Sequence, residues 1–358
     1  MNRRITLWGG KEFSFPLLFL FRGALALISL CLLFVVVSGC GGSDSNATAV
    51  PLDTPLRIGI IPTRGVLPLA VAETMGYYEH EGLSVELVSF QSTAEKDAAF
   101  QSGAIDGMFS DLVATTLLSA HGEGLKVVAM VAGGASNEGR VAIVAAPNSS
   151  IARAEDLRGH DLALSRNTIL DFATDELLSE VGLDEGVTRI PVGKVHLRLH
   201  MLLESKVSAA MLPEPLITYA QTQGARVILD DQKDGRCFLV LAFRQGVINH
   251  RTEAVERFLI AYNRAVDDIN CSPQQHRDAL ITVARVPRGI HEVVRVTRYA
   301  HWRVPTRKQV DRVTEWLQRR ALVSDNIGYR GLIDDRFVHN EDMRCIKIWK
   351  NEQLARVR

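Results

Sequence analysis

The sequence carries no net charge and few cysteines, and each shortage excludes a class of function. Its 358 residues contain 41 Lys and Arg against 41 Asp and Glu. Proteins that bind nucleic acid need a basic surface to neutralise phosphates, so we expect no nucleic-acid partner. After residue 40, cysteines occur only at Cys237, Cys271 and Cys345. Two of these thiols could pair, but three scattered cysteines form neither a disulfide framework nor a CxxC metal motif.

The motifs of several enzyme classes are also missing. The sequence contains neither a GxSxG nucleophile turn nor a lysine-bearing phosphate loop. The segment "SGAIDG", residues 102–107, lacks the glycine spacing of a dinucleotide loop. His196 and His200 are four residues apart, as in a zinc pair, but no HExxH pattern accompanies them. We therefore expect no metal, no cofactor and no catalytic activity.

The N-terminus has the layout of an export signal. Arg3, Arg4, Lys11 and Arg22 precede an uncharged, mostly apolar stretch at residues 23–37, and this order is typical of secretory signals. A membrane span needs about 20 apolar residues, so the stretch is short for a permanent helix. An uncleaved N-terminal anchor is the alternative, and both interpretations export the rest of the chain.

The residues after the apolar stretch predict a lipid anchor. The sequence "VSGC", ending at Cys40, resembles the bacterial lipobox, in which the cysteine receives a diacylglycerol and the chain is cut just before it. We therefore predict a lipoprotein signal peptide at residues 1–39, lipidation of Cys40 and a flexible polar tether at residues 40–55. The mature protein would be extracytoplasmic and lipid-anchored to the cell membrane, in a periplasm or on the cell surface.

From residue 56 onward, short apolar runs alternate with helical periods. "LRIGIIP" and "LSVELVSF" read as strands around a helix at residues 68–81, and the same pattern restarts at "RVAIVAAP". Strands separated by helices predict βαβ units and an α/β fold. Residues 252–320 are expected to be mostly helical. We predict a first lobe at residues 56–145 and 246–323, a second lobe at 146–245, and a C-terminal tail at 324–358.

Two parts of the sequence carry a family resemblance. They are "LRIGIIPTRGVLPLAVAETMGYYEHEGL" with the later "SGAIDG", and "LALSRNTILDFATDELLSEVGL" with "MLLESKVSAAMLPEPLITYAQTQGARVI". Over residues 55–323 the chain resembles the solute-binding lipoproteins of ABC importers, in the branch of thiamine-pyrimidine-precursor and alkanesulfonate or taurine binders. The resemblance implies a type II periplasmic-binding-protein fold, in which two lobes with mixed or parallel sheets enclose a hinged cleft.

The resemblance also implies a function and partners. A monomer would capture a small polar or anionic solute, such as a sulfonate or a pyrimidine, and present it to an ABC permease and its ATPase. One alternative is an enzyme on the same fold, as in relatives that make a pyrimidine, but the cysteine-rich metal motif of those relatives is absent here. Another alternative is a ligand sensor that acts on a signalling partner.

The candidate ligand contacts are the loops that follow strands, because ligands of α/β sheets bind beyond the carboxyl ends of the strands. These loops combine polar side chains with helix N-termini, which favour anionic or polar groups. Inward arginines would favour a carboxylate, sulfonate or phosphate, and an inward Asp111 would favour a base or an amine. Several candidates are also ordinary helix caps that need no ligand. The candidates are Thr63, Arg64, Gly65, Pro68, Ser110, Asp111, Gly134, Ala135, Ser136, Ser165, Arg166, Asn167, Thr168 and Glu214.

Overall fold

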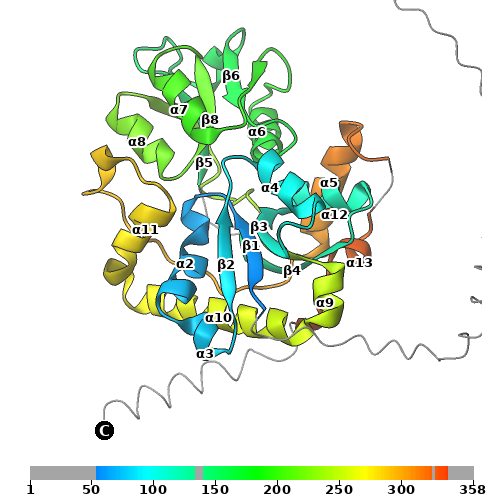
Figure 1. Cartoon of the computed structure of the whole chain (residues 1–358). Coiled ribbons are helices and arrows are strands. Elements are labelled where there is room, and N and C mark those ends of the chain that lie inside the picture. Colours follow the sequence, from blue (N-terminus) through cyan, green and yellow to red (C-terminus); the bar gives the residue numbers. More distant parts are fainter. Residues whose placement is uncertain (1–53, 134–139, 325–326, 338–358) are drawn as a thin grey trace, which may run out of the picture. The chain divides into compact units, whose positions relative to one another are not determined.

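Two five-stranded sheets organise the part of the chain that the structure describes. The computed structural model describes residues 54–133, 140–324 and 327–337 (Figure 1). The first sheet has the order β2-β1-β3-β10-β4 and the second has the order β7-β6-β8-β5-β9. The first consists of β1 (Leu56–Ile60), β2 (Val85–Ser89), β3 (Gly107–Asp111), β4 (Leu125–Ala132) and β10 (Leu239–Arg244). The second consists of β5 (Val141–Ala145), β6 (Asp161–Leu164), β7 (Thr188–Pro191), β8 (Ala209–Pro213) and β9 (Arg226–Asp230).

Both sheets are mixed and share one pairing pattern. In the first sheet, β1 is parallel to β2 and β3, whereas β10 is antiparallel to β3 and β4. In the second sheet, β6 is parallel to β7 and β8, whereas β5 is antiparallel to β8 and β9. All five residues of β3 and all five of β5 are buried, as expected for strands covered on both faces. The predicted α/β class with mixed sheets is confirmed.

Helices pack around each sheet (Figure 1). The longest, α10, buries Val255, Phe258, Leu259, Tyr262 and Val266 along one face, and this spacing of three and four residues marks an amphipathic helix. The helices near the first sheet are α2 (Leu67–Thr74), α3 (Tyr77–His80), α4 (Thr93–Gln101), α5 (Leu112–Ala120), α9 (Gln245–His250), α10 (Thr252–Cys271) and α11 (Arg277–Val283). Those near the second are α6 (Ile169–Glu180), α7 (Val195–Leu203) and α8 (Leu216–Thr222). The last two helices are α12 (Arg307–Arg319) and α13 (Tyr329–Leu332).

The chain passes between the sheets twice, after β4 and before β10. The predicted lobe boundaries at 145/146 and 245/246 placed β5 in the first lobe and β10 in the second, and the strand pairing reverses both assignments. The physical reason is that both strands are short, apolar and almost wholly buried. Their sequences therefore give no indication of which sheet they join.

Two predicted helical regions differ from the structure. The helix expected at 68–81 is divided into α2 and α3 by Gly76, whose left-handed φ of 69° ends α2. The segment from 291 to 306, expected to be mostly helical, forms no helix. There Arg303 pairs with Met130 of β4, and Arg303 N donates to Met130 O at 2.9 Å. Pairing with a strand replaces the local helical preference in this segment.

Helices α6 and α12 join the two halves of the described chain, all of which falls within one compact unit. Trp316 of α12 packs edge-on against Phe172 of α6, with ring centroids 5.6 Å apart. Its Nε1 donates to Asp175 Oδ2 at 2.8 Å. Arg320 approaches Asp175 at 2.8 Å and the fully buried Asp171 at 3.2 Å. The apolar cluster around these residues includes side chains from both sheets.

Part of the predicted C-terminal tail packs against the first sheet. Ile333 bridges to Val127 of β4, and Leu332, Ile333 and Phe337 are buried. Residues 325–326 and 338–358 lie outside the described residues, as do residues 1–53, which hold the predicted signal peptide, the lipidation site Cys40 and most of the tether. Among the described helices, none is both long enough and apolar enough to cross a membrane.

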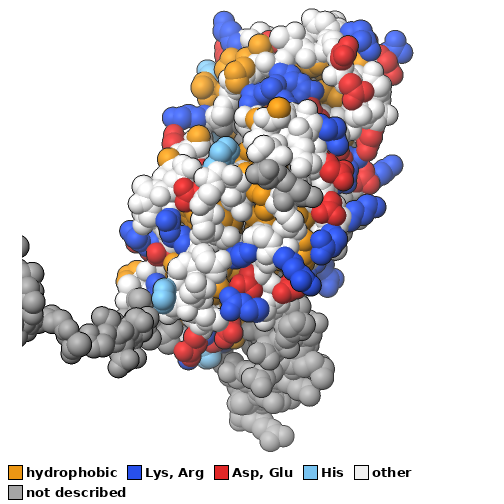
Figure 2. All heavy atoms as spheres, turned by 90° about the vertical axis from the view of Figure 1, so that its right-hand side faces the viewer, with side chains coloured by type: hydrophobic (Ala, Val, Ile, Leu, Met, Phe, Trp, Pro, Cys, Tyr) orange, Lys and Arg blue, Asp and Glu red, His pale blue; other side chains and the backbone are white. Residues whose placement is uncertain are grey.

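The surface agrees with the balanced composition. On the face shown in Figure 2, Lys and Arg side chains alternate with Asp and Glu side chains. On that face neither sign forms a broad patch.

Candidate functional site

A cavity of about 160 Å³ is lined by residues from both sheets and from both passages between them. Strands β3, β5 and β8 contribute residues near their ends, and α4, α6 and α7 contribute residues of their first turns. The N-cap residues of α4, α5 and α6 all border this cavity: they are Ser92, Asp111 and Thr168. Three helix N-termini, each with a partial positive charge, therefore face one small space.

The first-sheet side of the cavity contains a buried lysine. Lys96 on α4 is 1% exposed, and its Nζ donates to Ser110 Oγ at 2.6 Å. The same Nζ lies 3.4 Å from Asp97 Oδ1. Lys96 thus brings a positive charge to the cavity and fixes the Ser110 hydroxyl.

Asp111 follows Ser110 and caps α5. Its Oδ1 accepts a hydrogen bond from Ala114 N at 2.9 Å. Burial raises the pKa of Asp111 to about 6, while the Ala114 hydrogen bond and the Lys96 charge act in the opposite direction. The charge of Asp97 adds to the rise in the Asp111 pKa. The cavity is therefore less negative at mildly acidic pH than the presence of Asp111 suggests.

Asp111→Asn is expected to stabilise the protein at pH 7 but not at pH 4. The pKa of Asp111 is about 6 in the folded chain and near 4 in an unfolded one. The stability contributed by the protonated carboxyl is therefore fully present below about pH 4 and is lost as the pH rises through about 6. Asparagine keeps the cap and removes the titration. Urea unfolding should show a gain of roughly 2 to 3 kcal/mol at pH 7.

The control for this prediction is the same pair of proteins at about pH 4, where both side chains are neutral and the two free energies of unfolding should coincide. An equal difference between wild type and Asp111→Asn at both pH values would contradict it.

Gly65 allows the loop at residues 63–65 to pack closely against the ring of Phe109. A Cβ at Gly65 would lie 2.8 Å from Phe109 Cζ, so a larger residue would push the loop away from the cavity. Arg64 precedes Gly65, and its backbone oxygen accepts a hydrogen bond from Tyr299 Oη at 2.7 Å. These contacts hold the loop from Thr63 to Gly65 at the cavity rim.

An arginine at the first passage, directly before β5, is fully paired. Arg140 Nη1 donates to Glu214 Oε1 at 3.1 Å, and its Nη2 donates to Asp230 Oδ2 at 2.8 Å. The other oxygen of Glu214 accepts from Thr218 Oγ1 at 2.8 Å. Glu214 borders the cavity, but both oxygens of its carboxylate already have protein partners.

A second arginine has no such partner. Arg198 of α7 is completely buried and lines the cavity. Its Nη1 donates to Ser165 Oγ at 2.7 Å and to Val192 O at 2.6 Å. Within the described residues, Nε and Nη2 of Arg198 have no hydrogen-bond partner.

The predicted site residues divide into three groups. Those that line the cavity are Thr63, Arg64, Gly65, Ser110, Asp111, Ser165, Thr168 and Glu214. Pro68 is buried inside α2, while Arg166 and Asn167 are exposed and bond to the carboxylate of Asp171, so these three do not line it. Gly134, Ala135 and Ser136 lie outside the described residues.

Several lining residues were not predicted. They are, among others, Gln91, Ser92, Thr93, Lys96, Phe109, Arg140, Arg198 and Cys237. "QST", residues 91–93, follows the predicted strand "LSVELVSF" and leads into α4, so the rule applied to the other loops would have found it. Lys96 and Arg198 sit inside helices, where a charged residue usually faces solvent, and the sequence gives no signal for their burial.

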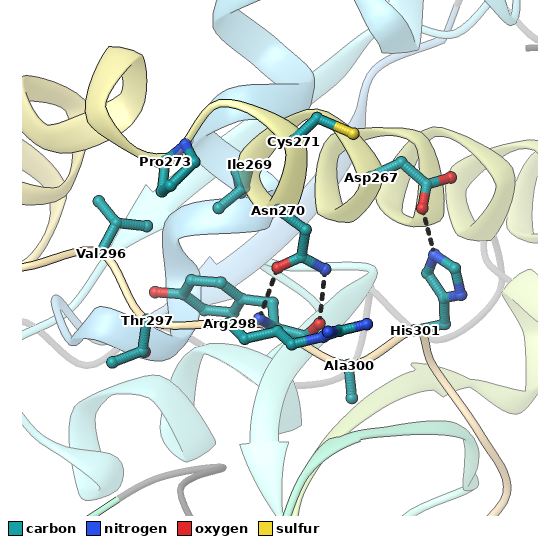
Figure 3. A pocket seen from close by; sticks show the side chains of 11 residues that line it. Asp267, Ile269, Asn270, Cys271, Pro273, Val296, Thr297, Arg298, Ala300 and His301 are labelled. Atoms are coloured by element: carbon teal, nitrogen blue, oxygen red, sulfur yellow. Dashed lines mark hydrogen bonds and ion pairs between the residues drawn. The ribbon is translucent and has the colours of Figure 1, made fainter.

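A larger hollow of about 630 Å³ lies between the end of α10 and residues 296–301. Figure 3 shows Asn270 bonded to the neighbouring extended segment and Asp267 paired with His301. Asn270 donates to Tyr299 O at 2.8 Å and accepts from Tyr299 N at 3.0 Å, as a neighbouring strand would. His301 pairs with Asp267 at 2.7 Å. These contacts attach an extended segment to α10, so we treat this hollow as structural.

A sequence comparison identifies the family to which this chain, with its smaller cavity, belongs. A sequence profile described as NMT1/THI5 like matches residues 64–276, more than half of the 358 residues. The chain belongs to the NMT1/THI5-like family. This match confirms the resemblance predicted from the sequence. Among curated proteins, none matches the sequence.

Solved structures resemble this NMT1/THI5-like chain closely in fold. The ligand-binding component of an ABC-type import system from Staphylococcus aureus, with zinc bound, is 15% identical with a TM-score of 0.67, covering 81% of this chain and 99% of that chain. The alkanesulfonate-binding protein SsuA from Xanthomonas axonopodis, bound to MOPS, is 16% identical with a TM-score of 0.66, covering 77% and 96%. The periplasmic nitrate-binding protein NrtA from Synechocystis is 13% identical with a TM-score of 0.62, covering 86% and 90%. These likenesses show that the chain has the periplasmic-binding-protein fold.

Proposed function

We propose that this protein is the extracytoplasmic solute-binding component of an ABC importer and that it captures a small polar or anionic solute in the 160 Å³ cavity. The observation that carries the proposal is that one cavity is lined by residues of both sheets. A solute held there contacts both halves at once. Binding therefore favours the arrangement in which the halves are together, because a ligand shifts an equilibrium toward the state that it binds more tightly.

The structural neighbours support this proposal. Proteins of the same fold are described as an importer component with zinc, an alkanesulfonate-binding protein with MOPS and a nitrate-binding protein. Two of these three solutes are oxyanions, and three helix N-termini face the cavity in this chain. An anionic or polar solute fits this electrostatic environment.

The proposal is tested by a solute screen on the full chain in mild detergent. Thermal unfolding would be followed with alkanesulfonates, carboxylates, amino acids, pyrimidines and nitrate, since a bound solute raises Tm by mass action. A stabilising solute should also lower the radius of gyration measured by X-ray scattering. Stabilisation by none of these solutes, together with failure to co-purify with a permease and an ATPase, would favour the sensor alternative.

We also propose that binding occurs without bond chemistry. Among the described residues, no group of three or more His, Cys, Asp or Glu side chains is placed to hold a metal ion. Lys96 and Ser110, which could resemble a base and a nucleophile, are joined in a hydrogen bond in which the ammonium donates. Mass spectrometry of any stabilising solute, recovered after long incubation, should return it unchanged, and a new product would revive the enzyme alternative.

Membrane attachment is proposed to depend on Cys40. Cys40→Ser removes the sulfur that would receive the lipid, and each buried acyl methylene contributes about 0.8 kcal/mol to membrane binding. The variant should therefore move from the membrane fraction to the soluble fraction, or accumulate as an unprocessed precursor, when cells are fractionated and blotted.

Cys271→Ser is the matched control, because Cys271 is exposed but lies far along the chain from the predicted signal. It should stay with membranes like the wild type. Full membrane retention of a Cys40→Ser protein that keeps its N-terminus would indicate an uncleaved anchor.

A further inference from the structure

The buried edge of Arg198 is the least satisfied charged group that borders the cavity. Arg198 is completely buried, and only its Nη1 has partners, Ser165 Oγ and Val192 O. Burial lowers the pKa of Arg198 to about 9, and no carboxylate among the described residues offsets the lost solvation. The side chain nevertheless stays charged at neutral pH. A buried charge without a partner is costly, so its retention beside a cavity points to a partner that arrives from outside.

The two unpaired atoms define the shape of that partner. Nε and Nη2 of Arg198 lie on one edge of the planar guanidinium, and their N–H bonds run nearly parallel. Two oxygens of one carboxylate or sulfonate match this edge in a bidentate pair. A neutral carbonyl offers one oxygen and leaves one N–H of this edge unpaired.

The remaining charges around the cavity agree with an anion. Lys96 adds a second buried positive charge, which pairs with Asp97 at 3.4 Å, and Glu214 is paired with Arg140. The negative carboxyl of Asp111 is protonated in part near pH 6. The N-termini of α4, α5 and α6 add partial positive charge.

The apolar side chains that line the cavity limit the size and polarity of the uncharged part of the solute. Phe109, Val195 and Leu239 border the same cavity. A cavity of about 150 Å³ lined by apolar side chains holds a molecule of benzene's size, and this one measures about 160 Å³. A compact organic molecule with a few carbons fits, and a large solute does not.

We propose that the solute is a small organic anion whose carboxylate or sulfonate head binds the Nε–Nη2 edge of Arg198, with its apolar body against Phe109 and Leu239. This inference rests on the proposed function. It selects an anion over the neutral pyrimidine that the family resemblance also allowed, and it assigns the head group to a residue in α7.

The test is calorimetric titration of the full chain in mild detergent. The probes are straight-chain alkanesulfonates and carboxylates of one to six carbons, each compared with its neutral amide. We expect at least one anion to bind, and its amide to bind at least about 30-fold more weakly, because an unpaired buried charge remains.

Variants locate the head group. Arg198→Met should weaken binding of that anion about 100-fold or more. Arg198→Lys keeps the positive charge but loses the pair of parallel N–H bonds, so it should weaken binding about 10-fold or more. Arg166→Gln is the matched control, since Arg166 is exposed, pairs with Asp171 and does not line the cavity. It should change affinity less than about twofold.

Thermal unfolding without solute separates recognition from structure. Because Arg198 is an uncompensated buried charge, Arg198→Met should melt at the same or a higher temperature than wild type while losing the stabilisation by the anion. A large fall in Tm without solute would assign Arg198 a structural role and overturn the inference. So would undiminished anion binding by Arg198→Met.

The panel also separates this inference from the function on which it rests. If a neutral pyrimidine binds and no anion does, the anion inference fails and the solute-binding function stands. If no anion and no neutral solute binds, both fail.

Discussion

Gly133→Ala is expected to lower the free energy of unfolding by about 3 kcal/mol or more. Gly133 ends the first sheet where the chain leaves β4, and its φ is +102°, a region that residues with a side chain rarely adopt. A Cβ there would lie 2.4 Å from Cys237 O and 2.9 Å from Phe238 Cα. Both atoms belong to the backbone of the returning passage, so they cannot rotate away. The change adds a clash to backbone strain and should be visible in urea unfolding followed by circular dichroism.

Gly103→Ala separates the two contributions. Gly103 also has a positive φ, +77°, but a Cβ there would meet nothing within 4 Å. This control should lose only about 1 to 2 kcal/mol, the cost of a left-handed residue with a side chain. Equal losses of unfolding free energy in the two variants would contradict the close contact between Gly133 and the backbone of residues 237–238.

Trp316→Ala is expected to cost about 3 to 5 kcal/mol of stability. Trp316 is 2% exposed, contacts Phe172 edge-on and donates its indole N–H to Asp175. Truncation leaves a cavity and removes the partner that orients the Asp175 carboxylate. Because Trp316 belongs to α12 and Phe172 to α6, the loss falls on the contact that joins the two halves.

Trp316→Phe keeps a ring and loses the N–H, so it should cost less than the alanine variant, about 1 to 2 kcal/mol. Leu197→Ala is the surface control, since Leu197 is 49% exposed and should change stability by less than about 0.5 kcal/mol. A tryptophan variant no more costly than Leu197→Ala would mean that α12 does not pack on α6.

The sequence predicted the positions of the strands better than the pairing of those strands into sheets. β1, β2 and β5 were predicted as strands from short apolar runs, and each lies within a few residues of its predicted position. The sheet to which β5 and β10 belong was not predictable, because the choice depends on contacts between residues 64 to 119 positions apart. The same limitation hid the break at Gly76, since glycine inside an apolar period has no fixed local outcome.

The candidate site shows the same division. Asp111 and Thr168 were predicted because a cap after a strand is a local pattern, and both line the cavity. Arg166 was predicted because it follows a predicted strand directly, whereas Arg198 was not among the candidates. In the structure Arg166 turns to Asp171, whereas Arg198 is buried by the way α7 packs on the second sheet. Burial of a charged residue is a tertiary property, and a helix pattern alone does not reveal it.

The position of β10 between β3 and β4 has a consequence for biosynthesis. During translation β4 emerges early, but its sheet neighbour follows only after residues 141–230 have been made. A half-made chain therefore exposes the facing edges of β3 and β4 until residue 244 has been made. The first sheet is therefore completed only after every strand of the second sheet has been synthesised.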